Sequence, residues 1–586
     1  MNFLRNLLAA ILGCLIAFGL LTGMFFIFVA LMSQADDGVV VKKNSILELS
    51  FVEPIRDYAG KDESDPFAGF WDDEIGLDEI THAIEMAKYD ANIEGISLTT
   101  SFLQAGMAQT QELREALEDF QSEGKFIYAY SDFFTQKDYY LASISDKLYL
   151  NPVGAMDFKG LAAEVLYFKD LQEKTGVKME VVRHGKYKSA VEPFLSNTMS
   201  EENRSQIQEL INSLWGAVID DISDARDIST ANLNIIADTL GGRTPKYAVE
   251  SGLVDGALHF DEYEALLKEK VNVAEGEKLN YVKFVDYVQK AGRKKNRVGK
   301  DKIAVVYAQG EIYYGEGGKE YLGQGLVIRA LQKAAENENV KAIVLRVDSP
   351  GGSALVSDII WREVELAKKQ KPVVVSFGNI AASGGYYIGV GGDKIYAEPT
   401  TITGSIGVFG TIPNISELAG NVGINAEQVG TNQNSVDYSL FEPMTDTFRN
   451  TIQEGIEDTY QTFLERVAKG RDMTIAQVDS LAQGRVWSGL HAKENGLIDE
   501  LGSLDDAIDA AAEMANLEVY GIRKYPKYKS DFEQFMENMS GAQAKIGEKL
   551  IQEEIGNEAF QLLKELKQLT EQKGIQAKMP FKLNIK

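Results

Sequence analysis

The chain has 586 residues, which is too long for one ordinary hydrophobic core, so two or more domains are expected. Its 45% apolar and 25% charged residues are typical of a globular protein. The formal net charge of −27 argues against a nucleic-acid partner. The single cysteine excludes an intrachain disulfide, and the four histidines provide few ligands for a metal site.

The segment 1–36 is predicted to be a membrane anchor. Residues 7–32 contain no charged side chain, and such a run exceeds the roughly 20 residues that span a bilayer as a helix. A cleaved signal peptide would have a shorter apolar core of about 7–15 residues. "SQA" at 33–35 only weakly resembles a cleavage site, so we expect a retained single-pass helix. Arg5 before the run and two aspartates after it put the N-terminus in the cytoplasm and the rest of the chain outside.

Apolar strands alternate with helical patterns in both halves of the remaining chain, as in "ISLTTSF" and "FIYAYS" of the first half and "AIVLRVDS" and "PVVVSF" of the second. This alternation predicts α/β units on largely parallel sheets. The halves also match at one constant offset: "YYL" at 139–141 corresponds to "YYI" at 386–388, and "DKLY" at 146–149 to "DKIY" at 393–396. We therefore expect a duplicated domain, with copies at 45–292 and 301–525.

The two copies differ at the positions that could carry chemistry. The second copy has "SGG" at 383–385 and the turn "DSPGG" ending at Gly352, and the first copy has neither. The first copy has "RHGKYKSAVEPF" at 183–194, where the second offers glutamine or asparagine opposite Lys188. One copy thus carries a candidate nucleophile, Ser383, without a base, and the other a candidate base without a nucleophile. We infer one active site assembled from both copies.

The chemistry of these residues fits acyl transfer. A serine hydroxyl becomes a nucleophile when a base accepts its proton, and lysine is a recognised base in this role. The ordinary lysine pKa of about 10.4 can fall to roughly 7–8 when apolar groups enclose the amine. Lys186 and Lys188 both fit, and their spacing does not distinguish them. Backbone N–H groups of Gly384, and of Gly351 or Gly352, could hold the oxyanion, because glycine permits close approach of the substrate.

Two other side chains lie in or near these motifs. Ser405 in "TITGSIGVFG" could contact the substrate or only cap a backbone group, and the second reading is favoured. His184 precedes Lys188 by four residues and suggests a triad, but a surface or hydrogen-bonded structural histidine is the preferred reading. Each motif taken alone is an ordinary turn or surface feature. The complementary loss across the duplication is what favours a joint site.

The segment 526–586 is predicted to be a helical extension of the second copy. Leucines recur in it at helical spacing, at Leu562, Leu563, Leu566 and Leu569. A packing or subunit-contact helix is favoured over a helix that lies on the membrane.

Together, "GKYKSAVEPF", "LRVDSPGGS", "NIAASGGYYI" and "TTITGSIGVFG" resemble the long, tandem-domain form of bacterial signal peptide peptidase A, also called protease IV. The resemblance covers nearly the whole chain and implies two tandem ClpP/crotonase-like α/β domains after a single N-terminal transmembrane helix. It implies that Ser383 is the nucleophile and that Lys188, rather than Lys186, is the general base. It also puts Gly352 and Gly384 in the oxyanion region.

The same resemblance implies a function. A serine endopeptidase with a Ser/Lys dyad would degrade signal peptides left in the membrane after their release from secretory precursors. The expected partners are cleaved signal peptides and other extended peptides, bound in an apolar groove around Ser383, and lipid through the N-terminal helix. The family's oligomeric bowls imply a homotetramer, held in the inner membrane with its catalytic domains on the periplasmic side. No cofactor and no metal are expected.

Two other functions remain open. An acyl-CoA hydratase or thioesterase could use the same glycine loop as an oxyanion hole, although an extracytoplasmic orientation counts against CoA substrates, which are cytoplasmic. A membrane-tethered scaffold that has kept the fold without catalysis predicts lost glycines or a lost lysine. This sequence retains each of the expected groups.

Overall fold

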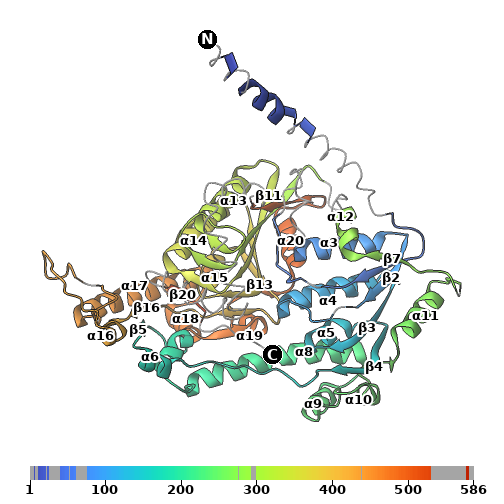
Figure 1. Ribbon diagram of the computed structural model, residues 1–586, viewed down its shortest axis with the longest axis horizontal. Coiled ribbons are helices and arrows are strands. Elements are labelled where there is room, and N and C mark those ends of the chain that lie inside the picture. The colour runs from blue at the N-terminus through green and yellow to red at the C-terminus, as the bar shows by residue number, and fades with distance from the viewer. Residues whose placement is uncertain are drawn as a thin grey trace.

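Each half of the chain forms its own largely parallel sheet (Figure 1). The computed structural model describes residues 5–6, 11–20, 23–24, 40–51, 53–60, 75–99, 101–274, 276–291, 299–436, 438–528 and 576–579. The first sheet is parallel throughout. Its strands in spatial order are β6 (Gly256–Ala257), β4 (Lys147–Met156), β3 (Phe126–Phe134), β2 (Ile93–Leu98), β1 (Ser45–Leu49) and β7 (Asn280–Lys283).

The second sheet repeats this plan with longer central strands. Strand β11 (Val340–Ser349) reads as a nearly continuous buried apolar run, which is typical of a parallel strand covered on both faces. The spatial order is β17 (Val486–Ser488), β15 (Ile402–Gly404), β13 (Val373–Ala382), β11, β8 (Lys302–Gln309) and β19 (Gly521–Tyr525), with β14 (Lys394–Ala397) beside β13 and β18 (Glu500–Leu501) beside β14. The predicted α/β class is confirmed.

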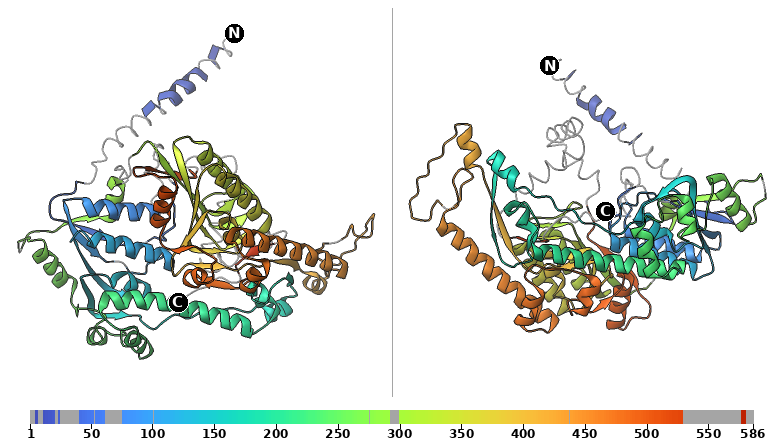
Figure 2. Two further views of the ribbon diagram at one scale, coloured as in Figure 1. Left: turned by 180° about the vertical axis from the view of Figure 1, so that it is seen from behind. Right: turned by 90° about the horizontal axis from the view of Figure 1, so that it is seen from below.

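Helices cover both sheets (Figures 1 and 2). Those of the first copy are α3 (Leu77–Tyr89), α4 (Met107–Gln121), α5 (Gln136–Ala142), α6 (Lys169–Thr175), α7 (Glu192–Leu195), α8 (Glu201–Arg226), α9 (Thr230–Asp238), α10 (Pro245–Glu250), α11 (Phe260–Lys270) and α12 (Phe284–Ala291). Those of the second are α13 (Gln324–Glu336), α14 (Ala354–Lys368), α15 (Gly384–Gly389), α16 (Ser416–Asn421), α17 (Asp446–Arg471), α18 (Ile475–Leu481), α19 (Gly489–Glu494) and α20 (Leu504–Met514).

Matching interactions recur in the two copies, as a duplication requires. The hydroxyl of Tyr139 donates to the carbonyl of Leu253 at 3.1 Å, and that of Tyr386 donates to the carbonyl of Leu497 at 2.8 Å. In each copy an arginine at the end of the long helix, α8 or α17, pairs with the aspartate that ends the matching GL(V/I)D segment. The predicted correspondence of the halves therefore extends to their hydrogen bonds.

A third sheet joins the copies beside the carboxyl end of β13. Its order is β10 (Tyr321–Gly323), β9 (Glu311–Tyr313), β12 (Gly351–Ser353), β20 (Gln576–Lys578), β16 (Phe409–Asn414) and β5 (Lys178–Arg183). Strand β5 of the first copy pairs antiparallel with β16 of the second over six residues. Helix α8 of the first copy also reaches the second, where Ser213 is 2.7 Å from Ser488 between hydroxyl oxygens. These contacts hold the segment "RHGKYKSAVEPF" of the first copy against the second copy.

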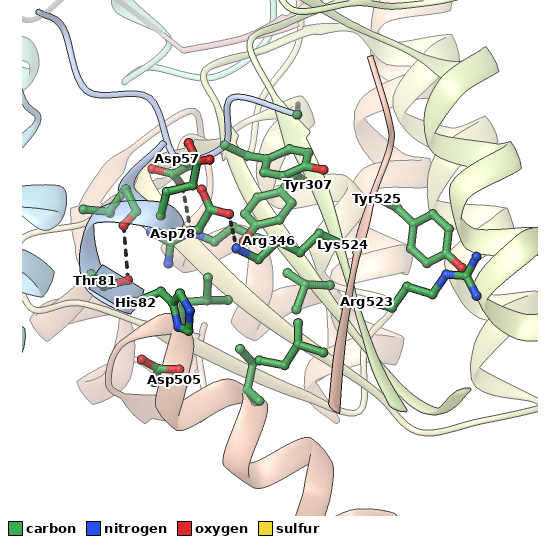
Figure 3. A pocket seen from close by; sticks show the side chains of 18 of the residues that line it. Asp57, Asp78, Thr81, His82, Tyr307, Arg346, Asp505, Arg523, Lys524 and Tyr525 are labelled. Carbon is green, nitrogen blue, oxygen red and sulfur yellow. Dashed lines mark hydrogen bonds and ion pairs between the residues drawn. The ribbon is translucent and has the colours of Figure 1, made fainter. Parts of the chain in front are cut away.

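A buried ion-pair cluster joins the copies at a separate place (Figure 3). Arg346 of β11 is 1% exposed, and its Nε lies 2.7 Å from the carboxylate of Asp57 of the first copy. Its guanidinium also pairs with Glu112 of α4. The three side chains line a cavity of about 1390 Å³ whose walls come from both copies and do not include Ser383 or Lys188. The cluster holds the two sheets together but is not part of the Ser383 site.

Two predicted segments fall mostly on residues that the structure does not describe. Of the predicted anchor at 1–36, only residues 5–6, 11–20 and 23–24 are described. Among the described parts of the chain, no helix combines the length and apolar character needed to cross a bilayer. The predicted C-terminal helix at Leu562–Leu569 lies outside the described residues.

Candidate active site

Ser383 lies at the junction where β13 ends and α15 begins. Its backbone has φ 55° and ψ −113°, and a positive φ is uncommon for residues other than glycine. Its N–H donates to the carbonyl of Gly404 at 2.8 Å, which fixes the turn. The residue is fully buried. A strained conformation held by its neighbours at a strand end is the kind of position that aims a reactive side chain.

Lys188 reaches this junction from the first copy, five residues beyond β5. The backbone on either side of it is tied to the second copy: the N–H of His184 donates to the carbonyl of Val408 at 3.1 Å, and that of Tyr187 to the carbonyl of Gln483 at 2.9 Å. A Cβ added to Gly484 would lie 2.6–2.7 Å from the Cβ, Cα and N of Lys188. Only a glycine at this position lets the lysine backbone approach so closely.

The amine of Lys188 has three hydrogen-bond partners. Its Nζ is 2.9 Å from the Oγ of Ser383, 3.0 Å from the Oγ of Ser405 and 3.1 Å from the carbonyl oxygen of Ser405. An uncharged amine has two N–H donors and one lone pair. Such an amine satisfies all three contacts when it donates twice to Ser405 and accepts the proton of Ser383, and a charged ammonium satisfies them with its three N–H donors. The charge of the amine is therefore decided by its surroundings.

The surroundings of Lys188 favour its neutral form. The side chain is fully buried, and burial lowers the pKa of Lys188 well below its ordinary value. Its Nζ lies 5.9 Å from the centre of the Phe409 ring, and the δ-carbon lies close to Gly407. No side-chain carboxylate is among the hydrogen-bond and salt-bridge partners found for Nζ in the described residues. An amine in this setting can accept a proton near neutral pH.

The structure shows where the other candidate site residues, Lys186, His184 and Ser405, lie relative to Ser383 and Lys188. Lys186 is exposed, and its Nζ lies 5.1 Å from the centre of the Tyr187 ring. The ring of His184 stacks on Tyr460 at 4.1 Å, away from any contact with Ser383, as expected of a structural histidine. Ser405 contacts the lysine itself, a role that neither alternative for Ser405 anticipated.

Three glycines near Ser383 have no room for a side chain: Gly351, Gly352 and Gly384. A Cβ added to Gly351 would lie 2.7 Å from the backbone N of Gly384, and one added to Gly352 would lie 2.1 Å from the carbonyl oxygen of Ile312 in β9. Both residues have φ values in the glycine region, 94° and 154°. The turn "SPGG" and the start of α15 therefore lie against each other. This brings the backbone of "SPGG" next to the N–H that follows the nucleophile candidate.

The first copy has "QKD" at 136–138 where the second has "SGG" at 383–385, so a glutamine stands at the position of Ser383. Asp138, at the start of α5, accepts hydrogen bonds from the N–H groups of Phe102 and Leu103, both at 2.8 Å. It also accepts from the hydroxyl of Thr135 at 2.7 Å. At the same offset these two N–H groups correspond to Ser349 and Pro350, so the carboxylate of Asp138 fixes the turn that matches "SPGG". The first copy therefore keeps this turn but has no serine at the position of Ser383.

Sequence reasoning missed Gly484 and Gly407. Both lie against Lys188, but in the sequence each is one glycine in a segment that predicts a turn, "AQGRVW" and "SIGVFG". Their distances to Lys188 depend on how β5 docks on β16, which no local pattern specifies. Within the described residues, no cluster of three or more His, Cys, Asp or Glu side chains could hold a metal ion.

Comparison with known proteins places the chain in a family. The model of peptidase family S49 matches it twice, at residues 119–274 and 365–518, once in each copy. "Protease 4" of Haemophilus influenzae is 38% identical over 452 residues, which are 75% of this chain and 73% of the relative. "Putative signal peptide peptidase SppA" of Enterococcus faecium is 39% identical over 184 residues, 31% of this chain and 53% of the relative. A solved ClpP1 mutant from Listeria monocytogenes aligns with 35% of this chain and 94% of its own, at 15% identity and a TM-score of 0.24. With a family match in each copy and a relative aligned over 73% of its own length, this chain belongs to peptidase family S49 and is a serine protease.

Proposed function

We propose that this serine protease is a membrane-tethered endopeptidase that degrades signal peptides left in the membrane, with Ser383 as nucleophile and Lys188 as general base. The observation that supports it most is the 2.9 Å contact between Nζ and Oγ across the two copies. The name of the Enterococcus faecium relative supports the substrate class. The long apolar run at 7–32 supports a tether that brings the enzyme to peptides in the bilayer.

In the proposed mechanism, the free amine of Lys188 removes the proton of Ser383 as Oγ bonds to the carbonyl carbon of the substrate. The resulting oxyanion is stabilised by the N–H groups of Gly384 and Gly352. Preorganised donors of this kind contribute about 2.7–4 kcal/mol each. Lys188 then gives its proton to the departing amine, and water hydrolyses the ester by the same steps in reverse order. The two contacts with Ser405 keep Nζ pointed at Oγ throughout.

The location and assembly of the enzyme belong to the same proposal. The segment 1–36 spans the inner membrane once, and both copies lie on the periplasmic side, in keeping with Arg5 before the apolar run and acidic residues after it. Four chains assemble into a homotetramer. Protease protection in intact and opened spheroplasts would test the orientation, and light scattering of the detergent-solubilised chain would test the number of subunits.

The alternative functions are less well supported. A scaffold has no need for a buried lysine, and burying an amine costs free energy that catalysis by Ser383 would justify. An acyl-CoA enzyme of the same fold needs an oxyanion hole, but it does not need a Ser–Lys pair at hydrogen-bond distance. The dyad therefore favours peptide or ester hydrolysis over either alternative.

A fluorescent synthetic signal peptide in detergent micelles tests the proposal. The full chain should cleave it, and Ser383→Ala and Lys188→Ala should each lower kcat/KM by at least about 10³-fold, because members of a dyad act as one unit. Lys186→Ala is the matched control: it makes the same substitution two residues away, at an exposed side chain, and should retain full activity. Cleavage that survives either dyad substitution would contradict the assigned roles. An enzyme that cleaves a soluble unfolded protein but not the signal peptide would contradict the substrate.

A further inference from the structure

A buried glutamine of helix α8 contacts the segment that carries Lys188. Residues 184–188 belong to no helix or strand, so the regular hydrogen bonds of such an element do not hold their backbone. Gln206 is 1% exposed, and its Nε2 donates to the carbonyl of Tyr187 at 3.2 Å and to the Oγ of Ser189 at 3.0 Å. These are the residues on either side of Lys188. Gln206 therefore restrains the chain on both sides of the proposed base.

The oxygen of the same amide contacts the second copy. Oε1 of Gln206 accepts the N–H of Val486 in β17 at 3.4 Å, the longest of these hydrogen bonds. Val486 lies opposite Gly404 in the antiparallel pair of β17 and β15. The carbonyl of Gly404 in turn accepts the N–H of Ser383 at 2.8 Å. One side chain thus joins the segment of the base to the strand pair that holds the backbone of the nucleophile.

The orientation of the Gln206 amide is determined by its partners. A backbone carbonyl only accepts and a backbone N–H only donates, so Nε2 faces Tyr187 and Oε1 faces Val486. Oδ1 of Asn203 also accepts from Nε2 at 3.0 Å, and Nδ2 of Asn203 donates to the carboxylate of Glu192 at 2.6 Å. Glu192 is the glutamate of "RHGKYKSAVEPF". This motif therefore supplies both the base and part of the network that orients Gln206.

Gln206 reaches the reacting atoms only through these contacts. None of the hydrogen bonds found for Nζ of Lys188 in the described residues involves Gln206. Without the amide, the lysine segment would lose two hydrogen bonds and its link to β17. The distance between Nζ and Oγ would then be less well fixed, and displacement of a catalytic group lowers the rate steeply.

We propose, on the basis of the Ser383–Lys188 dyad proposed above, that Gln206 is a positioning residue for catalysis, which keeps Nζ at reaction distance from Oγ by tying the lysine segment of the first copy to β17 of the second. Gln206 gives and takes no proton during the reaction. Its loss lowers kcat and leaves KM nearly unchanged, because a residue that is 1% exposed offers no surface to a bound peptide.

The first test is Gln206→Met in the full chain in detergent micelles, because methionine has a similar length without the amide. Its kcat should fall about 10-fold and its KM should change less than about 2-fold. Tyr139→Phe is the stability control, since it removes one buried hydrogen bond from the core of the first copy and should lower the urea midpoint without lowering kcat. Gln208→Met makes the same substitution at an exposed position of α8 and should change neither quantity. If Gln206→Met lowers the urea midpoint but keeps the wild-type kcat, its role is only structural and the proposal is wrong.

The second test uses a milder change. Ser189→Ala removes one acceptor of Gln206 and should lower kcat about 3-fold, a result that can be read even where Gln206→Met does not fold. Combined with Gln206→Met, it should lower kcat no further than Gln206→Met alone, because both substitutions break the same hydrogen bond. A wild-type kcat for Ser189→Ala, or losses that multiply in the double variant, would overturn the proposal.

The choice of substrates separates this proposal from the proposed function. Each variant is assayed on the fluorescent signal peptide and on a fluorescent, unfolded soluble protein. A wild type that cleaves only the unfolded protein overturns the proposed substrate, and kcat on that protein then decides the role of Gln206. A wild type that cleaves neither overturns the proposed function and the role of Gln206 with it.

Discussion

Replacing Gly484 with alanine should displace Lys188, and the resulting loss of activity can be distinguished from a loss of fold stability. Gly484 has φ +83°, and an added Cβ would lie 2.6–2.7 Å from Lys188 backbone and Cβ atoms. Carbon atoms in contact normally lie about 3.5–4.0 Å apart, so the lysine must move by about 1 Å. Displacement of a catalytic group by 1 Å can lower a rate by on the order of 100-fold. We therefore expect kcat/KM of Gly484→Ala to fall about 100-fold.

Gly423 provides a matched control for this experiment. It has the same φ, +83°, but an added Cβ would meet no atom within 4 Å. Alanine at either position costs about 1–2 kcal/mol for its left-handed backbone, so both variants should lose a similar amount of stability from this cause. The assay is kcat/KM on the signal peptide, together with the free energy of unfolding in urea. If Gly484→Ala is as active as Gly423→Ala, the close contact with Lys188 does not position the base.

Two further results are expected. The kcat/KM of wild type should rise as the pH passes the lowered pKa of Lys188 and then level off, because only the free amine accepts the proton of Ser383. A rise centred near the ordinary lysine pKa of about 10.4 would contradict the effect of burial. Arg346→Met should lower the free energy of unfolding by about 3–5 kcal/mol, because it leaves two buried carboxylates without their cation. Arg329→Met, which breaks an exposed pair, should cost less than about 1 kcal/mol in the same urea titration, and equal losses would refute the importance of burial.

The pairing of Ser383 with Lys188 could be predicted because each copy of the duplication lacks what the other has. Residues at matched positions can be compared without geometry, on the sole condition that one site be complete. The choice between Lys186 and Lys188 was different, because both lie in the same segment. The sequence alone did not distinguish the two lysines, and the resemblance indicated Lys188. In the structure Lys188 is buried and Lys186 is exposed.

The role of Ser405 could not be predicted, for a physical reason. Its hydroxyl and its carbonyl both reach Nζ only because its backbone has φ 49°, a conformation that a serine rarely adopts and that its N–H bond to the carbonyl of Arg485 helps to hold. The third sheet was missed for a related reason. Its strands come from distant parts of the chain, and the register of β5 on β16 depends on the docking of whole domains. Short strands of this kind carry too little sequence pattern to be recognised.

The division of the dyad between copies links catalysis to the interface. The first copy has Gln136 at the position of Ser383, and the second copy has no lysine at the position of Lys188. In the proposed mechanism neither copy can therefore act alone, and the distance between Nζ and Oγ is set by how the copies dock. Strand β5, helix α8 and the buried pairs of Arg346 all fix that docking. A change at the interface far from Ser383 that lets the copies shift by a fraction of an ångström should lower kcat before it unfolds the protein, because proton transfer depends on this distance more steeply than packing does.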